Sequence, residues 1–404
     1  MPTPPPSSSD DPSTAAGEAA SMPRARVGAW LVGARGSVAT TATLGLHALA
    51  AGLTEPVGLT TVGPAFDGVD LVGLDGIVVG GHDVATTPLV KRAEELAAGG
   101  LLPGRLIHAL ADRLELTEAD LRAVPEAART QQEAIDARAR DIEEFRRRHD
   151  LDHVVVVDVS STEPLPPASA VLEDGDAFDE AVRSQRHAVP ASTEAAAAAI
   201  AAGAGYACFT PSLGLGAPVL RRRADAAGLP YAGQDGKTGE TLLRTVLAPM
   251  FTARAFSVHS WAGTNLLGGG DGATLADPEA VDSKLKSKTR GLHDLLGEQV
   301  VAPLHIDNVP DMGDVKTSWD HVSATAFLGS RVTLQTTWSA YDSALAAPLV
   351  IDLVRLVALA MARGESGALA ALGAYFKDPW GSDVHAFAEQ QRALVTWAHG
   401  TPAR

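Results

Sequence analysis

Short runs of apolar residues, each followed by glycine or by polar side chains, recur through the first half of the chain. The clearest lie at residues 26–33 (RVGAWLVG), 74–84 (LDGIVVGGHDV) and 152–164 (DHVVVVDVSSTEP). Their apolar residues are nearly continuous, which is typical of strands buried on both faces of a parallel sheet. The pattern predicts an α/β fold, with the polar ends, His82 with Asp83 and residues 160–163, at the carboxyl edge where such sheets bind ligands.

Segments with helical periodicity separate these runs. Residues 34–53 follow the first run, and the charged segment 117–148 predicts a solvent-exposed surface helix. Residues 190–212 predict a helix that opens at Ala195 behind a Ser192 N-cap, and then a strand that holds Cys208 as an inert core residue.

The last third of the chain predicts one more strand and two more helices. Residues 331–340 have the β-branched content of a strand. The apolar segment that follows Tyr341 predicts a long structural helix with Asp342 at its start, and a last helix is predicted to run through Arg392.

The connection after the first run has the spacing Gly33-x-x-Gly36-x-x-Ala39. A strand, a glycine turn and a helix form the first unit of a dinucleotide-binding fold, in which helix-terminal N–H groups receive a pyrophosphate. Arg35 and Ser37 can add phosphate contacts. By itself, such a turn is as compatible with a plain strand-to-helix connection as with nucleotide binding.

Lysine and aspartate concentrate in residues 231–316, in a chain whose bases are otherwise mostly arginine. The residues concerned are Asp235, Lys237, Asp271, Lys284, Lys286, Lys288, Asp314 and Lys316. A buried lysine can lose its proton whereas arginine holds it, so lysine can carry protons as well as positive charge. Lys237 and Thr238 lie in a glycine-rich loop before an amphipathic helix, a position suited to anions, although the spacing of a P-loop is absent.

Composition limits the classes of partner. The formal net charge of −16 and the pI of about 5.1 repel nucleic acids and anionic membranes, so any bound anion must lie in a local basic pocket. The single cysteine, Cys208, rules out an intrachain disulfide and a cysteine zinc site, and it fits a cytoplasmic protein. The histidines show no metal-ligand spacing, and no segment is predicted to span a membrane.

At 404 residues the chain is expected to form two domains. Residues 1–23 lack the pattern of a signal peptide and predict a disordered tail. Residues 24–235 and 341–404 are predicted to form a Rossmann-type dinucleotide-binding domain, and residues 236–340 an inserted second α/β domain.

Six blocks taken together carry a resemblance to a known family. They are GQDGKTGETLLRTVLAPMF, NLLGGGDG, DSKLKSK, DVKTSWD, YDSALAAPLVIDL and FKDP. In type, order and spacing they resemble the myo-inositol-1-phosphate synthase family. The resemblance implies a Rossmann-type domain that binds NAD, a second domain for catalysis whose sheet builds a homotetramer, and an internal redox cyclisation of a hexose 6-phosphate. Some members of the family use a divalent or monovalent cation, so the resemblance allows one here.

The resemblance also assigns individual residues. The catalytic positions of the family fall on Lys284, Lys288, Lys316, Lys377 and Asp342, and the same lysines with Asn265 and Asp271 are expected to bind substrate. Lys286 is an additional lysine that is expected to face solvent. The expected cofactor-binding residues are Gly33, Ala34, Arg35, Gly36, Ser37, Val38, Gly81, His82, Ser161, Thr162, Asp235, Lys237, Thr238 and Asp314.

In the reaction of this family, oxidation at C5 of glucose 6-phosphate acidifies the C6 protons, an enolate closes on the C1 aldehyde, and the ketone is then reduced. By this resemblance Lys316 transfers protons and stabilises the enolate, Lys377 polarises a carbonyl, and Lys284 with Lys288 meets the phosphate or the C5 oxygen. Asp342 orients a lysine. The alternative for any of these charged residues is an interdomain salt bridge.

Two departures from the family bear on the substrate. Residues 268–270 are glycines where the family often carries polar or aromatic side chains, and Val315 replaces a serine or tryptophan. A same-fold cyclase that closes a five-membered cyclitol phosphate from fructose 6-phosphate therefore stays open beside the conversion of glucose 6-phosphate to myo-inositol 1-phosphate. A net sugar phosphate dehydrogenase and a non-catalytic NAD-binding regulator are further alternatives.

Overall fold

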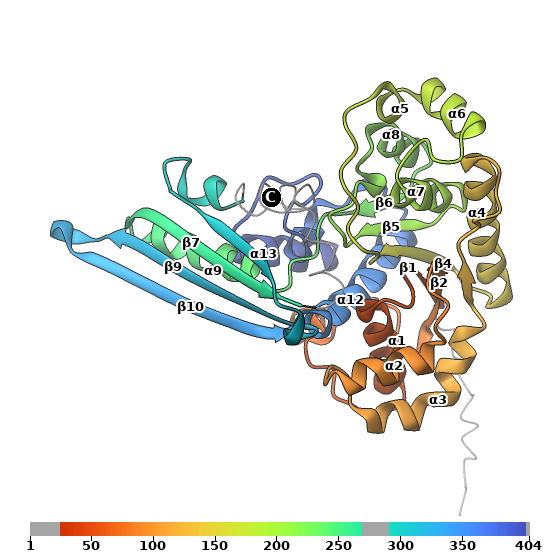
Figure 1. Cartoon of the computed structure of the whole chain (residues 1–404), viewed down its shortest axis with the longest axis horizontal. Coiled ribbons are helices and arrows are strands. Elements are labelled where there is room, and N and C mark those ends of the chain that lie inside the picture. The colour runs from red at the N-terminus through yellow and green to blue at the C-terminus, as the bar shows by residue number, and fades with distance from the viewer. Residues whose placement is uncertain (1–24, 269–290, 401–404) are drawn as a thin grey trace, which may run out of the picture.

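The computed structural model describes residues 25–268 and 291–400. These residues form two β-sheets, one covered by helices on both faces and one that extends away from it as a long ribbon of strands (Figure 1). The predicted α/β class and the Rossmann-type parallel sheet are confirmed. The predicted tail, residues 1–23, lies outside the described part of the chain.

The first sheet has seven strands in the order β11-β6-β5-β4-β1-β2-β3, and all of its neighbouring strands are parallel. Its central strands end level with one another, because Val32 pairs with both His82 and Asp158, and Asp158 pairs with Cys208. The loops that follow these strands therefore lie side by side at the carboxyl edge. The strands are β1 (Val27–Val32), β2 (Ile77–Asp83), β3 (Leu121–Ala123), β4 (His153–Asp158), β5 (Gly205–Cys208), β6 (Pro230–Ala232) and β11 (Gly367–Ala368).

Helices cover both faces of this sheet, which explains its uninterrupted apolar strands. Ala29 and Leu31 of β1 pack with α1 (Ser37–Ala50), α2 (Leu89–Ala98), α3 (Gly104–Glu118) and α12 (Asp342–Ala362). Trp30 and Val32 point to the opposite face. They pack there with α4 (Gln131–Arg148), α6 (Gly175–Ser184), α7 (Ala191–Ala201) and α8 (Pro218–Ala226), beside the short α5 (Ala170–Glu173).

Helix α12 is the one described helix that is long and apolar enough to cross a membrane, with a mean hydropathy of 2.1. It is a core helix instead, because 72% of that window is buried inside the protein. It packs on α1 and against β4 and β5, as expected for a structural helix (Figure 1).

The second sheet has the order β10-β9-β7-β8, with β7, β9 and β10 antiparallel and β8 parallel to β7. Its strands are β7 (Ser257–Leu267), β8 (Leu304–Asn308), β9 (Val315–Thr325) and β10 (Arg331–Tyr341). Helix α9 (Glu240–Ala253) covers one face, where Phe251 packs with Trp261 and Val322. The last helix, α13 (Phe387–Ala398), packs against α9 and the short 3-10 helix η7 (Ala370–Tyr375).

Single-turn or short 3-10 helices occupy several connections. They are η1 (Thr60–Val62), η2 (Pro64–Phe66), η3 (Leu74–Gly76), η4 (Gly214–Gly216), η5 (Pro310–Met312), η6 (Phe327–Gly329) and η7 (Ala370–Tyr375).

Three sequence-based element boundaries were wrong. Residues 117–148 are not one helix: α3 ends at Glu118, β3 follows, and a loop with Pro125 leads to Thr130, whose side chain caps α4. The proline explains the break, since it disfavours helix in the residue before it. Helix α7 begins at Ala191 behind Pro190, so Ser192 lies in its first turn and is not the N-cap. The last helix continues past Arg392 to Ala398.

Candidate active site

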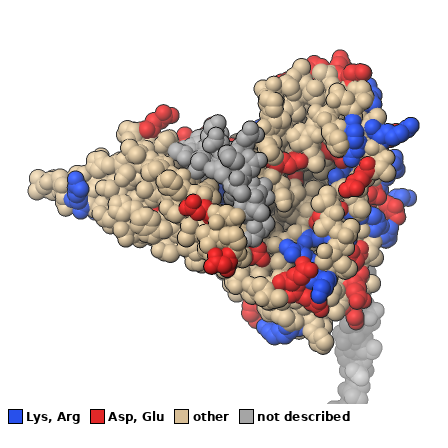
Figure 2. All heavy atoms as spheres, viewed as in Figure 1, with Lys and Arg blue, Asp and Glu red and all other residues tan. Residues whose placement is uncertain are grey.

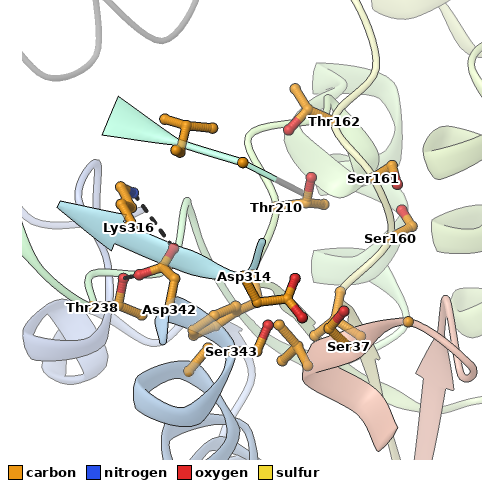
Figure 3. A pocket seen from close by; sticks show the side chains of 18 of the residues that line it. Ser37, Ser160, Ser161, Thr162, Thr210, Thr238, Asp314, Lys316, Asp342 and Ser343 are labelled. Atoms are coloured by element: carbon orange, nitrogen blue, oxygen red, sulfur yellow. Dashed lines mark hydrogen bonds and ion pairs between the residues drawn. The ribbon is translucent and has the colours of Figure 1, made fainter. Parts of the chain in front are cut away.

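A cavity of about 530 Å³ lies between the carboxyl edge of the first sheet and the near end of the second sheet. One wall comes from the start of α1 and from the loops after β4 and β5. The other comes from the ends of β7 and β8, the start of β9 and the start of α12. Figure 3 shows Ser160, Ser161, Thr162 and Thr210 on the first side, facing Lys316 and Asp342 on the second.

The glycine turn between β1 and α1 forms one end of the cavity. Gly33 has a φ of +83°, and a Cβ there would lie 2.9 Å from Ser160 Cα, so this close approach and this backbone conformation both require glycine. Gly36 is the N-cap of α1, which has no side-chain cap. The first N–H groups of a helix have no partner within it, and Gly36, Ser37 and Val38 line the cavity. An uncapped helix start with this tight turn fits the pyrophosphate of NAD.

Five predicted cofactor residues shape this turn and do not line the cavity: Gly33, Ala34, Arg35, Gly81 and His82. The Arg35 guanidinium points to Glu118, 2.5 Å away. His82 is buried, accepts the Trp30 indole N–H at 3.0 Å and lies 3.0 Å from Asp141; burial lowers the pKa of its imidazole. The carbonyl of His82 accepts the N–H groups of Gly33 and Ala34, which fixes the turn.

Arg92 of α2 was missed by the sequence reasoning, although it lines the cavity. Its Nη2 donates to Ser37 Oγ and its Nε donates to the carbonyl of Arg35, both at 3.2 Å. In the sequence it belongs to the charged run KRAEEL, which resembles any solvated helix face, so no local signal identified it. Thr210 was missed as well, and only its position after β5 could have indicated it, whereas Ser160 belongs to the polar end at residues 160–163 that was predicted at the ligand-binding edge.

Lys316 and Asp342, each predicted to be catalytic, form the first pair that the fold brings together. Lys316 Nζ lies 3.4 Å from Asp342 Oδ2, and Thr238 Oγ1 donates to Asp342 Oδ1 at 2.7 Å (Figure 3). Burial by itself raises the pKa of Asp342. The Lys316 charge, the Thr238 hydroxyl and the Lys377 charge outweigh it and lower this pKa from 3.8 to about 2. The carboxylate is therefore ionised at neutral pH and lies beside Lys316, and its predicted role is to orient a lysine.

Lys377 and Asp235 form a second pair in the same cavity. Lys377 Nζ donates to Asp235 Oδ2 at 2.6 Å, although the two residues are 142 positions apart. Backbone hydrogen bonds hold the two loops together, from Lys377 N–H to the Asp235 carbonyl and from Asp378 N–H to the Gln234 carbonyl. Asp235 was predicted as a cofactor residue, and the structure places it beside a lysine in the cavity wall.

The structure places two predicted residues away from the cavity. Asn265 is fully buried and donates to Glu240 Oε2 at 2.8 Å, beneath the second sheet. Its neighbours along β7, Leu267 and the following Gly268, line the cavity instead. Lys237 is also buried, and its Nζ donates to Gln390 Oε1 at 2.5 Å. Substrate binding by Asn265 and cofactor binding by Lys237 are not supported by these positions.

Asn265 belongs to a buried ionic cluster between α9 and the second sheet. Arg244 contacts Glu240 at 2.7 Å and Asp320 at 2.9 Å, and the Trp261 indole donates to Asp320 at 2.8 Å. Paired charges of this kind are costly to break, because a remaining partner would be buried without compensation. The cluster therefore has a structural role in attaching α9 to the sheet.

The remaining predictions divide into two groups. Ser161, Thr162, Thr238 and Asp314, which are predicted to bind the cofactor, line the cavity. Asp271, Lys284, Lys286 and Lys288 lie outside the described residues, and so do Gly269 and Gly270. Within residues 25–268 and 291–400, no group of three histidine, cysteine or acidic side chains is arranged to hold a metal ion.

Comparison with known proteins identifies the family. A family model described as Myo-inositol-1-phosphate synthase, an NAD-binding one, matches residues 27–399. Inositol-3-phosphate synthase 1 of Bacteroides thetaiotaomicron is 30% identical over 401 residues, which cover 90% of this chain and 91% of that protein.

Two solved structures share the fold. Inositol-3-phosphate synthase from Caenorhabditis elegans has a TM-score of 0.83 at 21% identity, over 94% of this chain and 87% of that one. A myo-inositol-1-phosphate synthase-related protein from Thermotoga maritima has a TM-score of 0.72 at 23% identity, over 94% of this chain and 100% of that one. The match along nearly the whole chain confirms both the predicted resemblance and NAD as the cofactor, and the chain belongs to the myo-inositol-1-phosphate synthase family.

Proposed function

We propose that this chain is an NAD-dependent isomerase that cyclises glucose 6-phosphate to myo-inositol 1-phosphate, also numbered as the 3-phosphate. One observation carries the proposal: a single cavity holds the anion-binding turn of a dinucleotide fold and two lysines paired with carboxylates. The similarity of nearly the whole chain to the inositol-3-phosphate synthase of Bacteroides thetaiotaomicron supports this proposal.

The cofactor would be held at the turn. Bound NAD supplies reversible oxidation of one substrate carbon. The amides of Ser37 and Val38 at the start of α1 would receive its phosphates. The hydroxyls of Ser161 and Thr162, in the loop after β4, line the cavity and would donate hydrogen bonds to the cofactor.

Lys316 is placed to move protons at the substrate. Its partner Asp342 fixes the direction of the ammonium group, which can stabilise an enolate oxygen and return a proton to it. Lys377, held by Asp235, provides a second positive charge in the same cavity and would polarise a carbonyl oxygen. Two oriented cations match a reaction in which oxyanions form at two different carbons in turn.

We infer that the substrate phosphate binds at the start of α9. Helix α9 starts at Glu240 without a side-chain cap, and Thr238, two residues earlier, lines the cavity beside Asp342. A helix N-terminus favours an anion. We place the phosphate there, with Lys284 and Lys288 as its predicted cationic partners.

The substrate is tested by product analysis. The protein is incubated with NAD and either glucose 6-phosphate or fructose 6-phosphate, and the products are identified by NMR. An inositol phosphate from glucose 6-phosphate, without net NADH, is the expected result. Fructose 6-phosphate is the relevant comparison because the departures Gly268 and Val315 both line the cavity. A cyclopentane polyol phosphate from it alone overturns the proposed substrate, and steady growth of absorbance near 340 nm indicates a net dehydrogenase.

The chain is proposed to act as a cytoplasmic homotetramer that associates through the face of the second sheet opposite α9. On β9 and β10 the outward residues of this open face are Thr317, Trp319, His321, Ser323, Thr325, Arg331, Thr333, Gln335, Thr337 and Ser339. Of these residues only Arg331 is charged, whereas charged side chains crowd the other part of the molecule (Figure 2). In a chain with a net charge of −16, a face without acidic side chains on β9 and β10 is where copies can meet with little repulsion.

A further inference from the structure

We propose that Arg92 binds the diphosphate of NAD and so supplies the positive charge that the glycine turn itself lacks. The inference rests on NAD use in the proposed function. It changes the assignment suggested by the sequence, in which Arg35 supplied that charge. In the structure Arg35 is turned away to Glu118, and Arg92 comes from another helix to the cavity side of the turn.

The start of α2 is anchored so that Arg92 reaches the turn. Glu118, at the end of α3, binds the Arg35 guanidinium with one oxygen and accepts the Leu89 N–H with the other, at 2.8 Å. Leu89 is the first residue of α2. Arg92 lies three residues later, on the same side of the helix. Its guanidinium then bonds Ser37 Oγ and the Arg35 carbonyl, next to the first amides of α1.

The distribution of positively charged side chains in the cavity also supports this role for Arg92. Among the described residues that line it, the only lysines and arginines are Arg92, Lys316 and Lys377. The two lysines are paired with carboxylates, Lys316 with Asp342 and Lys377 with Asp235. Arg92 also has a partner, Glu95 at 3.1 Å, but that pair is 30% and 46% exposed and so is screened by water. Arg92 is therefore the cation that a diphosphate at the start of α1 would meet.

Arginine suits this position chemically. Its planar guanidinium can donate two parallel hydrogen bonds to phosphate oxygens and keeps its charge at every relevant pH. Two of its nitrogens are already oriented by the turn, so little side-chain freedom remains to be lost when the diphosphate binds.

The test is calorimetric titration of the full chain with NAD, ADP and adenosine. Arg92→Ala is expected to bind NAD and ADP roughly 10- to 100-fold more weakly, the effect of losing hydrogen bonds to a charged group. Adenosine carries no phosphate, and its affinity is expected to change by less than about twofold. Lys91→Ala is the matched control, because Lys91 forms the same kind of i,i+3 pair on α2, with Glu94, but is 63% exposed and does not line the cavity.

Glu95→Gln is expected to strengthen ADP binding, whereas Arg92→Ala is expected to weaken it. Removing the carboxylate that competes for Arg92 is expected to tighten ADP binding by about two- to fivefold, the range of a surface ion pair. Arg92→Lys keeps the positive charge but lacks the planar guanidinium with its two parallel donors. Its affinity for ADP is expected to lie between those of wild type and Arg92→Ala. This variant also keeps the test valid if the alanine variant folds poorly.

Three results would overturn the proposal: unchanged ADP affinity in Arg92→Ala, equal losses for ADP and adenosine, or no binding of ADP by wild type. Equal losses would mean that Arg92 only shapes the turn. No sugar phosphate is used in this titration, so a wild-type protein that binds NAD but forms no cyclitol phosphate would refute the proposed function and leave the assignment of Arg92 standing.

Discussion

At the scale of single residues, the cavity depends on lysines whose direction is set by a carboxylate. Asp342 has a pKa of about 2, so it remains ionised and holds Lys316 at 3.4 Å. Lys377 is held in the same way by Asp235 at 2.6 Å. An oriented lysine can stabilise an oxyanion or transfer a proton without first reorganising, which is the main source of electrostatic catalysis.

Replacing Lys316 by alanine is predicted to lower kcat by at least about 100-fold, the usual contribution of a proton-transfer group. Asp342 keeps its hydrogen bond from Thr238, so the melting temperature is expected to stay within a few degrees. Activity is measured as inositol phosphate formed, with Lys91→Ala as the control. Full activity in the Lys316 variant would remove this residue from the mechanism.

Lys237 predicts a pH dependence of stability. Burial lowers the pKa of its amine from 10.5 to about 7. Between these values the unfolded chain holds a proton that the folded chain lacks, so stability rises with pH. The free energy of unfolding of wild type, relative to Lys237→Met, is expected to increase by about 2 to 3 kcal/mol from pH 7 to pH 9. Urea unfolding at both values measures it, and a difference independent of pH would contradict it.

At the scale of elements, the turn before α1 requires glycine at position 33, whereas the interior of α1 does not require the glycine at position 45. Gly33→Ala puts a side chain at a φ of +83° and 2.9 Å from Ser160 Cα. We predict a loss of about 1 to 3 kcal/mol in stability and weaker NAD binding. Gly45 lies within α1, and a Cβ there meets nothing within 4 Å. Gly45→Ala is therefore expected to increase the free energy of unfolding by about 0.5 to 1 kcal/mol and to leave NAD binding unaltered.

Thermal unfolding and calorimetric titration with NAD measure both glycine variants. If Gly33→Ala were as stable as wild type and bound NAD equally well, the turn would not be the strained, closely packed element that the structure shows. The two substitutions are chemically identical, so a difference between them reports only the backbone conformation and the surroundings of each glycine.

At the scale of the whole molecule, the proposed tetramer predicts the effect of a charge on the open face. Trp319 lies there on β9, 41% exposed and paired with Thr337. Trp319→Arg is expected to give a smaller species by light scattering, because a tetramer would bury four unpaired charges. Leu116→Arg is the control, since Leu116 is 73% exposed on α3. A tetramer that persists in Trp319→Arg, or a monomeric wild type, would contradict this interface.

Part of the architecture could be predicted from local pattern alone. The run of apolar residues in β1 and β4 indicated strands buried on both faces, and the glycine turn after Val32 indicated a helix start suited to phosphate. The sequence blocks that contain Asp235, Lys316, Asp342 and Lys377 indicated the family before any of these residues was placed. These features depend on neighbours within a few positions, which a sequence displays directly.

Other features were decided only by the tertiary structure. Arg35 and Arg92 are both arginines near the turn, but Glu118 turns the first away and a hydrogen bond to Ser37 brings the second in. Asn265 faces Glu240 under the sheet and not the cavity. Lys377 finds Asp235 across 142 residues. The sequence by itself determined the elements, the family and the kinds of reactive group. Which groups share the cavity was decided by the fold, because the direction of a side chain depends on partners that come from other elements.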